Sequence, residues 1–357
     1  MLTTEDLGGW KMRVFEGYQK GVNLGGWLSQ CVSYDKAHFD GFITKKDIED
    51  IASFGLDHVR VPVDYDVFMK EVSGEDVVNE EGMSHIEDCI GWCRDCGLNM
   101  ILDLHKAKGY MFDSEAVENA DLFFEDEMLQ NVFYETWEMF AQRFGKYKDM
   151  LAFELLNEVV NADYESKWNE IAANAIKRIR AIVPDIYIIV GGVHYNNVFA
   201  VPGIKVPVDD RTVFNFHCYE PLCFTHQKAY WVPGMTKDYD MFYPADIETM
   251  RKKSEEFSPD HMGAVFNECL DDGGPLFDKM FRQACDYAEE KGVPLYCGEY
   301  GVIDQAPLPD TLAWLRDINA SFKKFGIGRA LWNYKNKDFG LVDEHYAPIR
   351  KEMIEAL

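Results

Sequence analysis

The chain has 357 residues, of which 47% are hydrophobic and 14% are aromatic, and its formal net charge at pH 7 is −26. These proportions are ample for a folded core. The excess of acidic residues repels polyanions, which argues against nucleic acid or an anionic membrane as the main partner and leaves a neutral ligand unaffected.

Signals for targeting and for disulfides are sparse. No run of 18 apolar residues occurs, so no transmembrane helix is expected. The first twenty residues lack a basic segment followed by an apolar one, so we expect a cytoplasmic protein, or a secreted one if a leader precedes this sequence. The nine cysteines are odd in number and scattered, which favours reduced, buried thiols.

Short apolar segments alternate with amphipathic ones along most of the chain. After a lead-in over residues 1–20, the first strand closes in the Gly25-Gly26 turn. The predicted strands start near residues 22, 58, 99, 151, 186, 212, 294 and 330. The predicted helices span about 44–54, 83–96, 129–144, 164–183 and 309–325, and a final helix takes the last ten residues. Thr44 followed by Asp47 is a capping-box pattern, and Gly97 is typical of a helix C-cap.

Eight short strands that alternate with helices indicate a (β/α)8 TIM barrel. The sixth gap between strand starts is about 82 residues, against about 26–52 for the others. We therefore expect a single barrel domain over residues 1–357, with a small subdomain at about 220–275 inserted between strand six and its helix. The link 193–211 contains prolines and is weakly helical, so helix five should be short or irregular.

Polar or aromatic residues stand where most of these strands end. In a barrel the carboxyl ends of different strands converge on one pocket. Each residue alone has a structural explanation, because a strand-end histidine is often only hydrogen-bonded and an arginine can pair with any acidic neighbour. Together they favour a site. The candidates are Asn23, Arg60, His105, Asn157, Glu158, His217, Tyr219, Glu299 and Trp332.

Two glutamates, at the ends of strands four and seven, suggest the chemistry. Retaining glycosidases use two carboxyl groups about 5 Å apart, one as acid/base and one as nucleophile, and the two must differ in protonation. Glu299 beside Arg60 and the hydroxyl of Tyr219 would be held ionised, which makes it the nucleophile. Glu158 would then remain the acid/base. Asn157 can bind a sugar 2-hydroxyl, and Trp332 offers a flat face to a pyranose ring.

The order of seven motifs resembles glycoside hydrolase family 5, the cellulase family. These motifs are GVNLGGW, HVRVPVDY, LDLHKAKGYMF, FELLNEVV, NFHCYEP, LYCGEYGV and ALWNYKNKDFGLVD, and they cover nearly the whole chain. The resemblance implies the same roles for Glu158 and Glu299, a supporting shell of Arg60, His105, Asn157, His217 and Tyr219, and Trp332 as the platform at the subsite before the cleaved bond. Residues 224–231 further resemble compact bacterial endoglucanases with an inserted subdomain.

One departure concerns the residues after His105. Many cellulases of the family have paired histidines or a proline there, whereas this chain has Lys106-Ala107-Lys108. Two lysines beside the sugar-binding end would change the outer subsites, and so the substrate.

The resulting hypothesis is a retaining endo-β-1,4-glucanase, a monomer that cuts cellulose-like or mixed-linkage β-glucan, with glucomannan as a further substrate. An extended cleft would be lined by aromatic residues at outer subsites, namely Tyr110, Phe112, Phe224, Tyr230 and Trp231. An exo-acting β-glucosidase or β-1,3-glucanase and a β-mannanase stay open as alternatives, as does an inactive carbohydrate-binding barrel. No cofactor or catalytic metal is expected, because neither H-E-x-x-H nor EF-hand spacing occurs.

Three other features need an interpretation. Cys89, Cys93 and Cys96 have C-x3-C-x2-C spacing, but they fall on a helical apolar stripe and are expected in the core. A second Asn-Glu pair, at 267–268, falls in the insertion and is expected to be part of its structure. Glu154 lies within an apolar strand, so it needs a buried partner such as an arginine.

Overall fold

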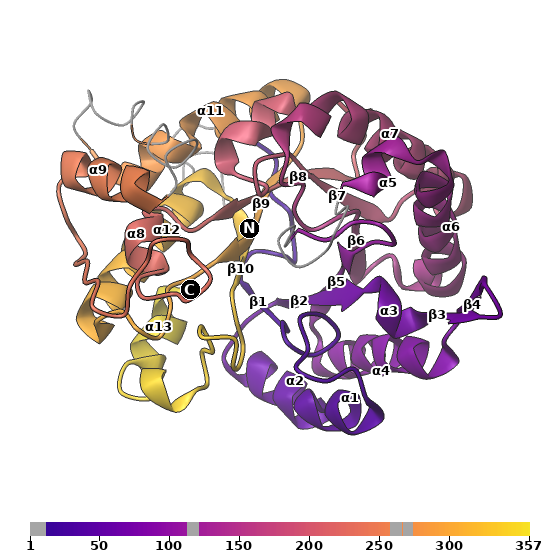
Figure 1. Cartoon of the computed structure of the whole chain (residues 1–357), viewed down its shortest axis with the longest axis horizontal. Coiled ribbons are helices and arrows are strands. Elements are labelled where there is room, and N and C mark those ends of the chain that lie inside the picture. The colour runs from indigo at the N-terminus through magenta and orange to yellow at the C-terminus, as the bar shows by residue number, and fades with distance from the viewer. Residues whose placement is uncertain (1–11, 113–120, 258–265, 267–273) are drawn as a thin grey trace.

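The computed structural model describes residues 12–112, 121–257, 266 and 274–357. Eight parallel strands form a closed barrel in the order β1-β10-β9-β8-β7-β6-β5-β2, and helices surround it (Figure 1). The predicted (β/α)8 barrel is confirmed. The strands are β1 (Gly21–Asn23), β2 (His58–Asp64), β5 (Asn99–Lys106), β6 (Leu151–Glu154), β7 (Tyr187–Gly191), β8 (Thr212–Cys218), β9 (Leu295–Tyr300) and β10 (Gly328–Leu331).

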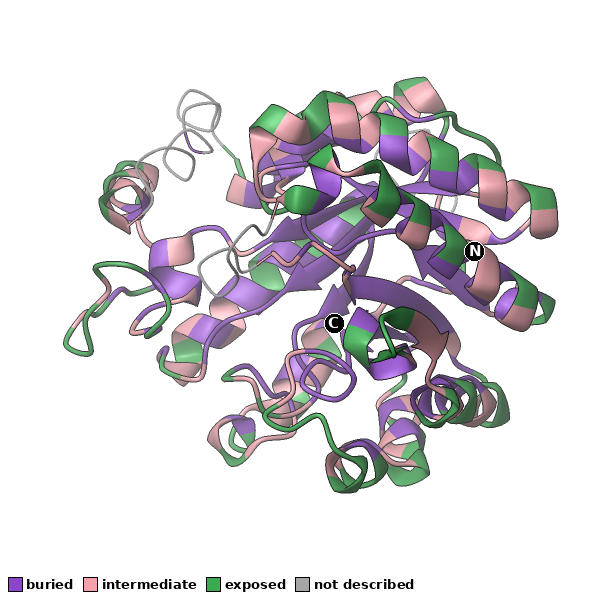
Figure 2. Cartoon of the chain, turned by 45° about the vertical axis from the view of Figure 1, so that its right-hand side comes forward, coloured by how far each residue is buried: buried purple, intermediate pink, exposed green. Residues whose placement is uncertain are grey.

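The helices that cover the barrel expose their outer faces, while the barrel strands are buried except at a few end residues (Figure 2). Thr44 caps α2 with the predicted capping box, and Gly97 ends α4 with a φ of 71°. The longer helices are α1 (Lys36–Phe42), α2 (Lys45–Ser53), α4 (Glu80–Cys96), α6 (Glu127–Phe144), α7 (Glu165–Ile182), α9 (Ile247–Phe257), α11 (Leu276–Lys291), α12 (Leu308–Phe325) and α13 (Arg350–Ala356). The short helical segments are α3 (Tyr65–Phe68), α5 (Leu122–Glu125), α8 (Leu222–Thr225), η1 (Gly145–Tyr147), η2 (Ala162–Tyr164), η3 (Val198–Gly203) and η4 (Glu344–Tyr346).

Some elements were not predicted from the sequence. The hairpin of β3 (Met69–Val72) and β4 (Glu75–Val78) is largely exposed, so it lacks the apolar pattern of a buried strand. Helix α1 buries a single side chain, Phe39, and therefore has no apolar stripe. The irregular link after strand five contains η3, a 3-10 helix with Pro202 inside it.

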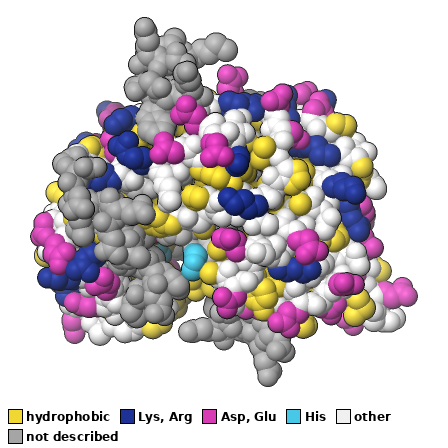
Figure 3. Space-filling view, turned by 90° about the horizontal axis from the view of Figure 1, so that it is seen from above, with side chains coloured by type: hydrophobic (Ala, Val, Ile, Leu, Met, Phe, Trp, Pro, Cys, Tyr) yellow, Lys and Arg dark blue, Asp and Glu magenta, His cyan; other side chains and the backbone are white. Residues whose placement is uncertain are grey.

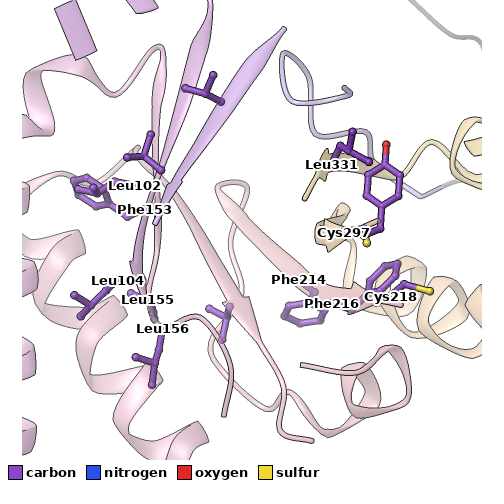
Figure 4. Packing of buried hydrophobic residues seen from close by; sticks show 14 of the residues in the cluster. Leu102, Leu104, Phe153, Leu155, Leu156, Phe214, Phe216, Cys218, Cys297 and Leu331 are labelled. Atoms are coloured by element: carbon purple, nitrogen blue, oxygen red, sulfur yellow. The ribbon is translucent and has the colours of Figure 1, made fainter. Parts of the chain in front are cut away.

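Alternation along the strands separates an outer core from the barrel interior. Side chains such as Leu102, Phe153, Phe214 and Leu331 belong to the large cluster between the barrel and its helices (Figure 4). Cys89 and Cys93 belong to it too, as predicted, and Cys96 packs against it. The eight cysteines in the described part of the chain are all free.

Apolar and polar layers fill the interior of the barrel. One end is closed by a separate cluster of Phe15, Tyr18, Ile101, Ala152, Ile189, Val213, Tyr296 and Ala330. Further along the same strands, towards their carboxyl ends, the inward residues become polar. Arg60, Asp103, Glu154 and Asn215 have no exposed surface. A barrel interior is normally filled by branched apolar residues, so this polar layer marks the functional end.

The inserted subdomain expected at about 220–275 stays a prediction; this range falls between β8 and α11. The described part of this segment contains α8 and α9. The pair Asn267-Glu268 lies outside the described residues. Acidic and basic side chains are interspersed over the face seen in Figure 3. No described helix is long and apolar enough to cross a membrane.

Candidate active site

Arg60 on β2 is the centre of the polar layer. Its Nε and Nη2 donate to the two oxygens of Glu154 at 2.7 and 2.8 Å. Its Nη1 donates to Oε1 of Glu299 at 2.7 Å and to Oδ1 of Asn23 at 2.9 Å. Glu154, whose partner could not be named from the sequence, is therefore paired with the arginine two strands away in the barrel.

A second carboxylate, Asp103 on β5, also faces Arg60. Its Oδ2 lies 2.9 Å from Nη2 of Arg60 and 2.7 Å from Nδ1 of His105. One guanidinium thus faces three buried carboxyl groups, so its charge cannot balance all of them. Burial raises the pKa of Asp103 and of Glu154 to about 7, while the positive charge of Arg60 acts in the opposite direction.

Glu299 on β9 receives two strong donors. Arg60 binds one of its oxygens, and the hydroxyl of Tyr219 donates to the other at 2.9 Å. Burial raises the pKa of Glu299, while the positive charge of Arg60 and the Tyr219 hydrogen bond act in the opposite direction. Both donors favour the ionised carboxylate.

Glu158, four residues beyond β6, has no such donors among the described residues. Its Oε1 lies 2.7 Å from Nδ1 of His217, and that nitrogen lies 3.9 Å from Oε2 of Glu299. Burial, reinforced by the negative charge of Glu299, raises the pKa of Glu158 well above its usual range. Burial also lowers the pKa of His217 far below its usual value, so this imidazole is neutral. Of the two glutamates, Glu158 therefore has the surroundings that favour the protonated form, and Glu299 has the donors that favour the ionised form.

The two glutamates approach each other closely. One oxygen of each, together with a ring nitrogen of His217, lies in a group whose atoms are all within 4.8 Å of one another. Retaining glycosidases place their carboxyl groups about 5–5.5 Å apart, and inverting enzymes about 6.5–9.5 Å. The nearest oxygens of the two glutamates are thus well below the inverting range and close to the retaining spacing.

These three residues are also the one group in the described part of the chain whose ligand types and spacing could hold a metal ion. Carboxylate oxygens and imidazole nitrogen are common ligands of transition metals. Here, however, Arg60 and Tyr219 already bind both oxygens of Glu299. Arg60 and Tyr219 therefore stabilise the carboxylate of Glu299 in the place where a bound cation would otherwise do so.

His105 and Trp332 form one wall of the site. Their rings are nearly parallel, with centroids 6.1 Å apart. Burial lowers the pKa of His105 to about 4, so it is neutral, and its Nε2 lies 3.0 Å from Nε2 of Gln30. The indole lies directly over Gly25, where a Cβ would approach it to 2.5 Å. The position of Trp332 thus requires a residue without a side chain at Gly25, the first glycine of the predicted turn.

The asparagines of the site connect it to the barrel wall. Asn157 accepts from Nη2 of Arg60 at 2.8 Å, and Asn23 accepts from Nη1. The nine candidates at the strand ends therefore come together in one cluster. Sequence reasoning did not identify Asp103, Gln30 and Asn215, since only the closed barrel brings each to its partner.

Two of the predicted outer-subsite aromatics are corrected by the structure. Phe224 has no exposed surface and packs on Tyr243. Tyr110 is buried too, and its hydroxyl bonds the backbone of Glu158 and Val160. Neither ring can stack on a sugar, because packing inside the protein already uses its faces.

The other aromatics of this group keep accessible surface. Trp231 is 42% exposed and Tyr230 is 85% exposed. Phe112 is half-buried, with its ring edge-on to His105. Trp231 is linked to the site through His226, whose ring contacts both Trp231 and Tyr219.

The two lysines after His105 point to partners of their own. Lys106 forms an ion pair with Asp66, and Lys108 with Asp76 on β4. These pairs engage both ammonium groups, so the departure from the family pattern adds no unpaired positive charge to the site.

Comparison with known proteins gives consistent results. The family model "Cellulase (glycosyl hydrolase family 5)" matches residues 17–338. Cellodextrinase A of Ruminococcus flavefaciens is 41% identical over 313 residues, which cover 88% of this chain and 84% of that protein. Endoglucanase C of Acetivibrio thermocellus is 37% identical over 345 residues, covering 95% and 98%. The structure of endoglucanase Cel5A from Thermotoga maritima superposes with a TM-score of 0.72 at 22% identity, covering 96% and 97%, which supports the fold.

Proposed function

Because the chain belongs to glycosyl hydrolase family 5 and is a glycoside hydrolase, we propose that it cuts β-1,4-linked glucan internally, with retention of configuration. Glu299 is the nucleophile and Glu158 is the acid/base. The observation that carries this assignment is the asymmetry of the pair. Arg60 and Tyr219 bind Glu299, whereas burial and the negative charge of Glu299 raise the pKa of Glu158, which has neutral His217 as its partner.

In the first step, an oxygen of Glu299 bonds to the anomeric carbon as the glycosidic bond breaks. The leaving sugar oxygen takes the electron pair of that bond and the proton of Glu158, so the departing group is a neutral alcohol. As Glu299 becomes an ester it loses its negative charge. Glu158, now ionised, no longer faces a second carboxylate, and its pKa falls towards that of a base.

In the second step, Glu158 removes a proton from water, whose oxygen attacks the anomeric carbon. The bond to Glu299 breaks and its electron pair returns to the carboxylate, which Arg60 and Tyr219 again stabilise. Two displacements on one carbon restore the β configuration. Burial of both glutamates restricts the number of waters that compete for these hydrogen bonds.

Sugar binding is assigned to the groups beside the pair. The indole of Trp332 and the ring of His105 present a flat wall to a pyranose, and Asn157 lies beside Glu158 where it can meet the 2-hydroxyl. Hydrogen bonds to that hydroxyl strengthen in the transition state. Exposed Trp231 and Tyr230 extend the binding surface away from the cleaved bond, which favours an extended substrate over a single terminal sugar.

A second candidate is an enzyme that prefers short cello-oligosaccharides. It is favoured by the name of one relative, Cellodextrinase A, which is 41% identical. Product sizes distinguish the two. The endo reading predicts a rapid fall in the viscosity of carboxymethylcellulose and mixed products from cellohexaose, whereas glucose alone at the earliest time point would contradict it.

Substrate class is tested by a panel of carboxymethylcellulose, lichenan, glucomannan, mannan and laminarin. We expect turnover of the first two, and preferred turnover of mannan or laminarin would refute the glucan assignment. The Glu299→Ala variant serves as the control for contaminating activity. Activity of that variant close to wild type would refute the nucleophile.

A further inference from the structure

The backbone just before Glu299 is irregular. In the register between β8 and β9, Phe216 faces Cys297 and His217 faces Glu299, so Gly298 is skipped. In the register between β10 and β9, Arg329 faces Cys297 and Leu331 faces Tyr300, so Gly298 and Glu299 together lie opposite the single residue Ala330. A bulge of this kind re-aims the side chain that follows it, and it removes regular partners from the backbone.

Two buried side-chain amides bind the Gly298 peptide groups in place of a neighbouring strand. Oδ1 of Asn215 accepts from the N–H of Gly298 at 2.9 Å. Nδ2 of Asn23 donates to the carbonyl oxygen of Gly298, also at 2.9 Å. Neither amide has any exposed surface. The residue that precedes Glu299 is thus held from two different strands, β8 and β1.

The partners of Asn215 determine which way its amide faces. A backbone N–H can only donate, so the oxygen of the amide must face Gly298. The Nδ2 group then points at Oε1 of Glu154 and donates to it at 2.8 Å. Glu154 also binds Nε and Nη2 of Arg60, and Arg60 binds Glu299. Asn215 is therefore connected to Glu299 by two routes, through the backbone of Gly298 and through Glu154 and Arg60 to the carboxylate.

Gly298 fits against Asn215 without free space. A Cβ on Gly298 would lie 2.9 Å from Nδ2 and 3.0 Å from Oδ1 of Asn215, and 3.0 Å from Nε2 of His217. Contacts below about 3.4 Å require the neighbour to shift. Any movement of the bulge towards β8 would therefore displace the Asn215 amide, and any loss of this amide would release the bulge.

We propose that Asn215 is a positioning residue for Glu299, fixing the bulge at Gly298 so that the carboxylate of Glu299 meets the anomeric carbon. This inference rests on the proposed role of Glu299 as nucleophile. Asn215 does not touch the substrate; it acts through Gly298 and through Glu154. Its loss should slow the attack of Glu299 while leaving sugar binding largely unchanged, because the side-chain hydrogen bonds of Asn215 go to Glu154 and Gly298 and not to Trp332, His105 or Asn157.

The test measures how fast Glu299 is trapped. In 2,4-dinitrophenyl 2-deoxy-2-fluoro-β-cellobioside, the carboxylate bonds to the anomeric carbon and dinitrophenolate leaves with the electron pair, so no proton from Glu158 is needed. The fluorine slows hydrolysis, and the covalent adduct accumulates. Saturation kinetics separate the trapping rate constant from the dissociation constant of the reagent.

The variant is Asn215→Ala, and the matched control is Asn319→Ala. Asn319 is equally buried and accepts from Tyr300 and Arg329 on β9 and β10, but it lies on α12 outside the barrel. We expect Asn215→Ala to lower the trapping rate constant about tenfold to a hundredfold, as a misplacement of about 1 Å does. The dissociation constant should change much less, and Asn319→Ala should lower thermal stability without slowing the trapping.

A second variant keeps the proposal testable if Asn215→Ala does not fold. Asn215→Asp retains an oxygen acceptor for the Gly298 N–H, so it should be trapped faster than the alanine variant. An unchanged trapping rate constant in both variants would overturn the inference, as would an equal loss in Asn319→Ala. Peptide mass spectrometry of the wild type separates the two claims, because a label on a residue other than Glu299 refutes the proposed function itself.

Discussion

The hydrogen bond from Tyr219 to Glu299 is the most informative single contact to remove. Its O–H donates to Oε2 of Glu299 at 2.9 Å, and Glu299 is nearly buried. A hydrogen bond to a charged group contributes about 1.5–3 kcal/mol, and one pKa unit corresponds to about 1.4 kcal/mol. Tyr219→Phe should therefore destabilise the ionised form of Glu299 by about 1.5–3 kcal/mol and raise its pKa.

The sign of the effect follows from the role of the carboxylate. Glu299 must be ionised to attack, and the lost donor stabilised the ionised form. The acidic limb of the kcat/KM profile should therefore move to higher pH, and activity should be lost earlier as the pH falls. The position of this acidic limb is measured by following the hydrolysis of an aryl β-cellobioside across the pH range. The ring itself stays, so its contacts with His226 and Phe339 are retained.

A tyrosine–carboxylate hydrogen bond outside the site provides a matched control. The hydroxyl of Tyr243 donates to the carboxylate of Asp317 at 2.8 Å, so Tyr243→Phe removes a comparable bond outside the site and should leave the pH profile in place. If Tyr219→Phe lowers kcat/KM by the same factor at every pH, or moves the acidic limb to lower pH, the reasoning about Glu299 is wrong.

Three further predictions concern the acid, the arginine and the outer aromatics. Glu158→Ala should lose more activity with poor leaving groups than with activated aryl glycosides, because only the former need its proton; equal losses would argue against the acid role. Arg60→Met should lower the free energy of unfolding at neutral pH by about 3–5 kcal/mol, since it leaves buried carboxylates uncompensated. The pKa values of these buried carboxyl groups lie above those in the unfolded chain, so they become protonated as the pH falls and need the arginine less. Urea unfolding should therefore show a smaller loss of stability near pH 5 than at neutral pH, and a loss that does not change with pH would refute this reasoning. Trp231→Ala should raise KM for cellohexaose but not for an aryl cellobioside, whereas Phe224→Ala should cost about 3–5 kcal/mol of stability with little change in KM; the reverse pattern would restore Phe224 as a subsite residue.

Much of the fold could be predicted because the barrel strands are buried on both faces. Such strands are continuous apolar runs, and the residues that follow them stand out as polar. This is why Asn157 with Glu158, and Glu299, could be placed at two converging strand ends from the sequence alone. The exposed hairpin β3–β4 has no comparable signal, since its strands contain no fully buried residue and only Met69 and Val78 pack against the core.

The polar layer inside the barrel could not be derived in the same way. Glu154 and Asn215 each lie within an apolar strand, and their partners come from other strands far along the sequence. Only the closed order of the strands brings Glu154 to Arg60 and Asn215 to Gly298. The prediction of aromatic residues at outer subsites was partly wrong for a related reason. Composition does not distinguish a buried ring such as Phe224 from an exposed one such as Trp231.

The anomeric configuration of the first product tests the central claim most directly. The approach of the Glu158 and Glu299 carboxyl groups to within 4.8 Å predicts a double displacement. Proton NMR during hydrolysis of an aryl β-cellobioside should therefore show the β-anomer of cellobiose first, with the α-anomer appearing only through mutarotation. An α-anomer formed first would mean a single displacement and would contradict the account.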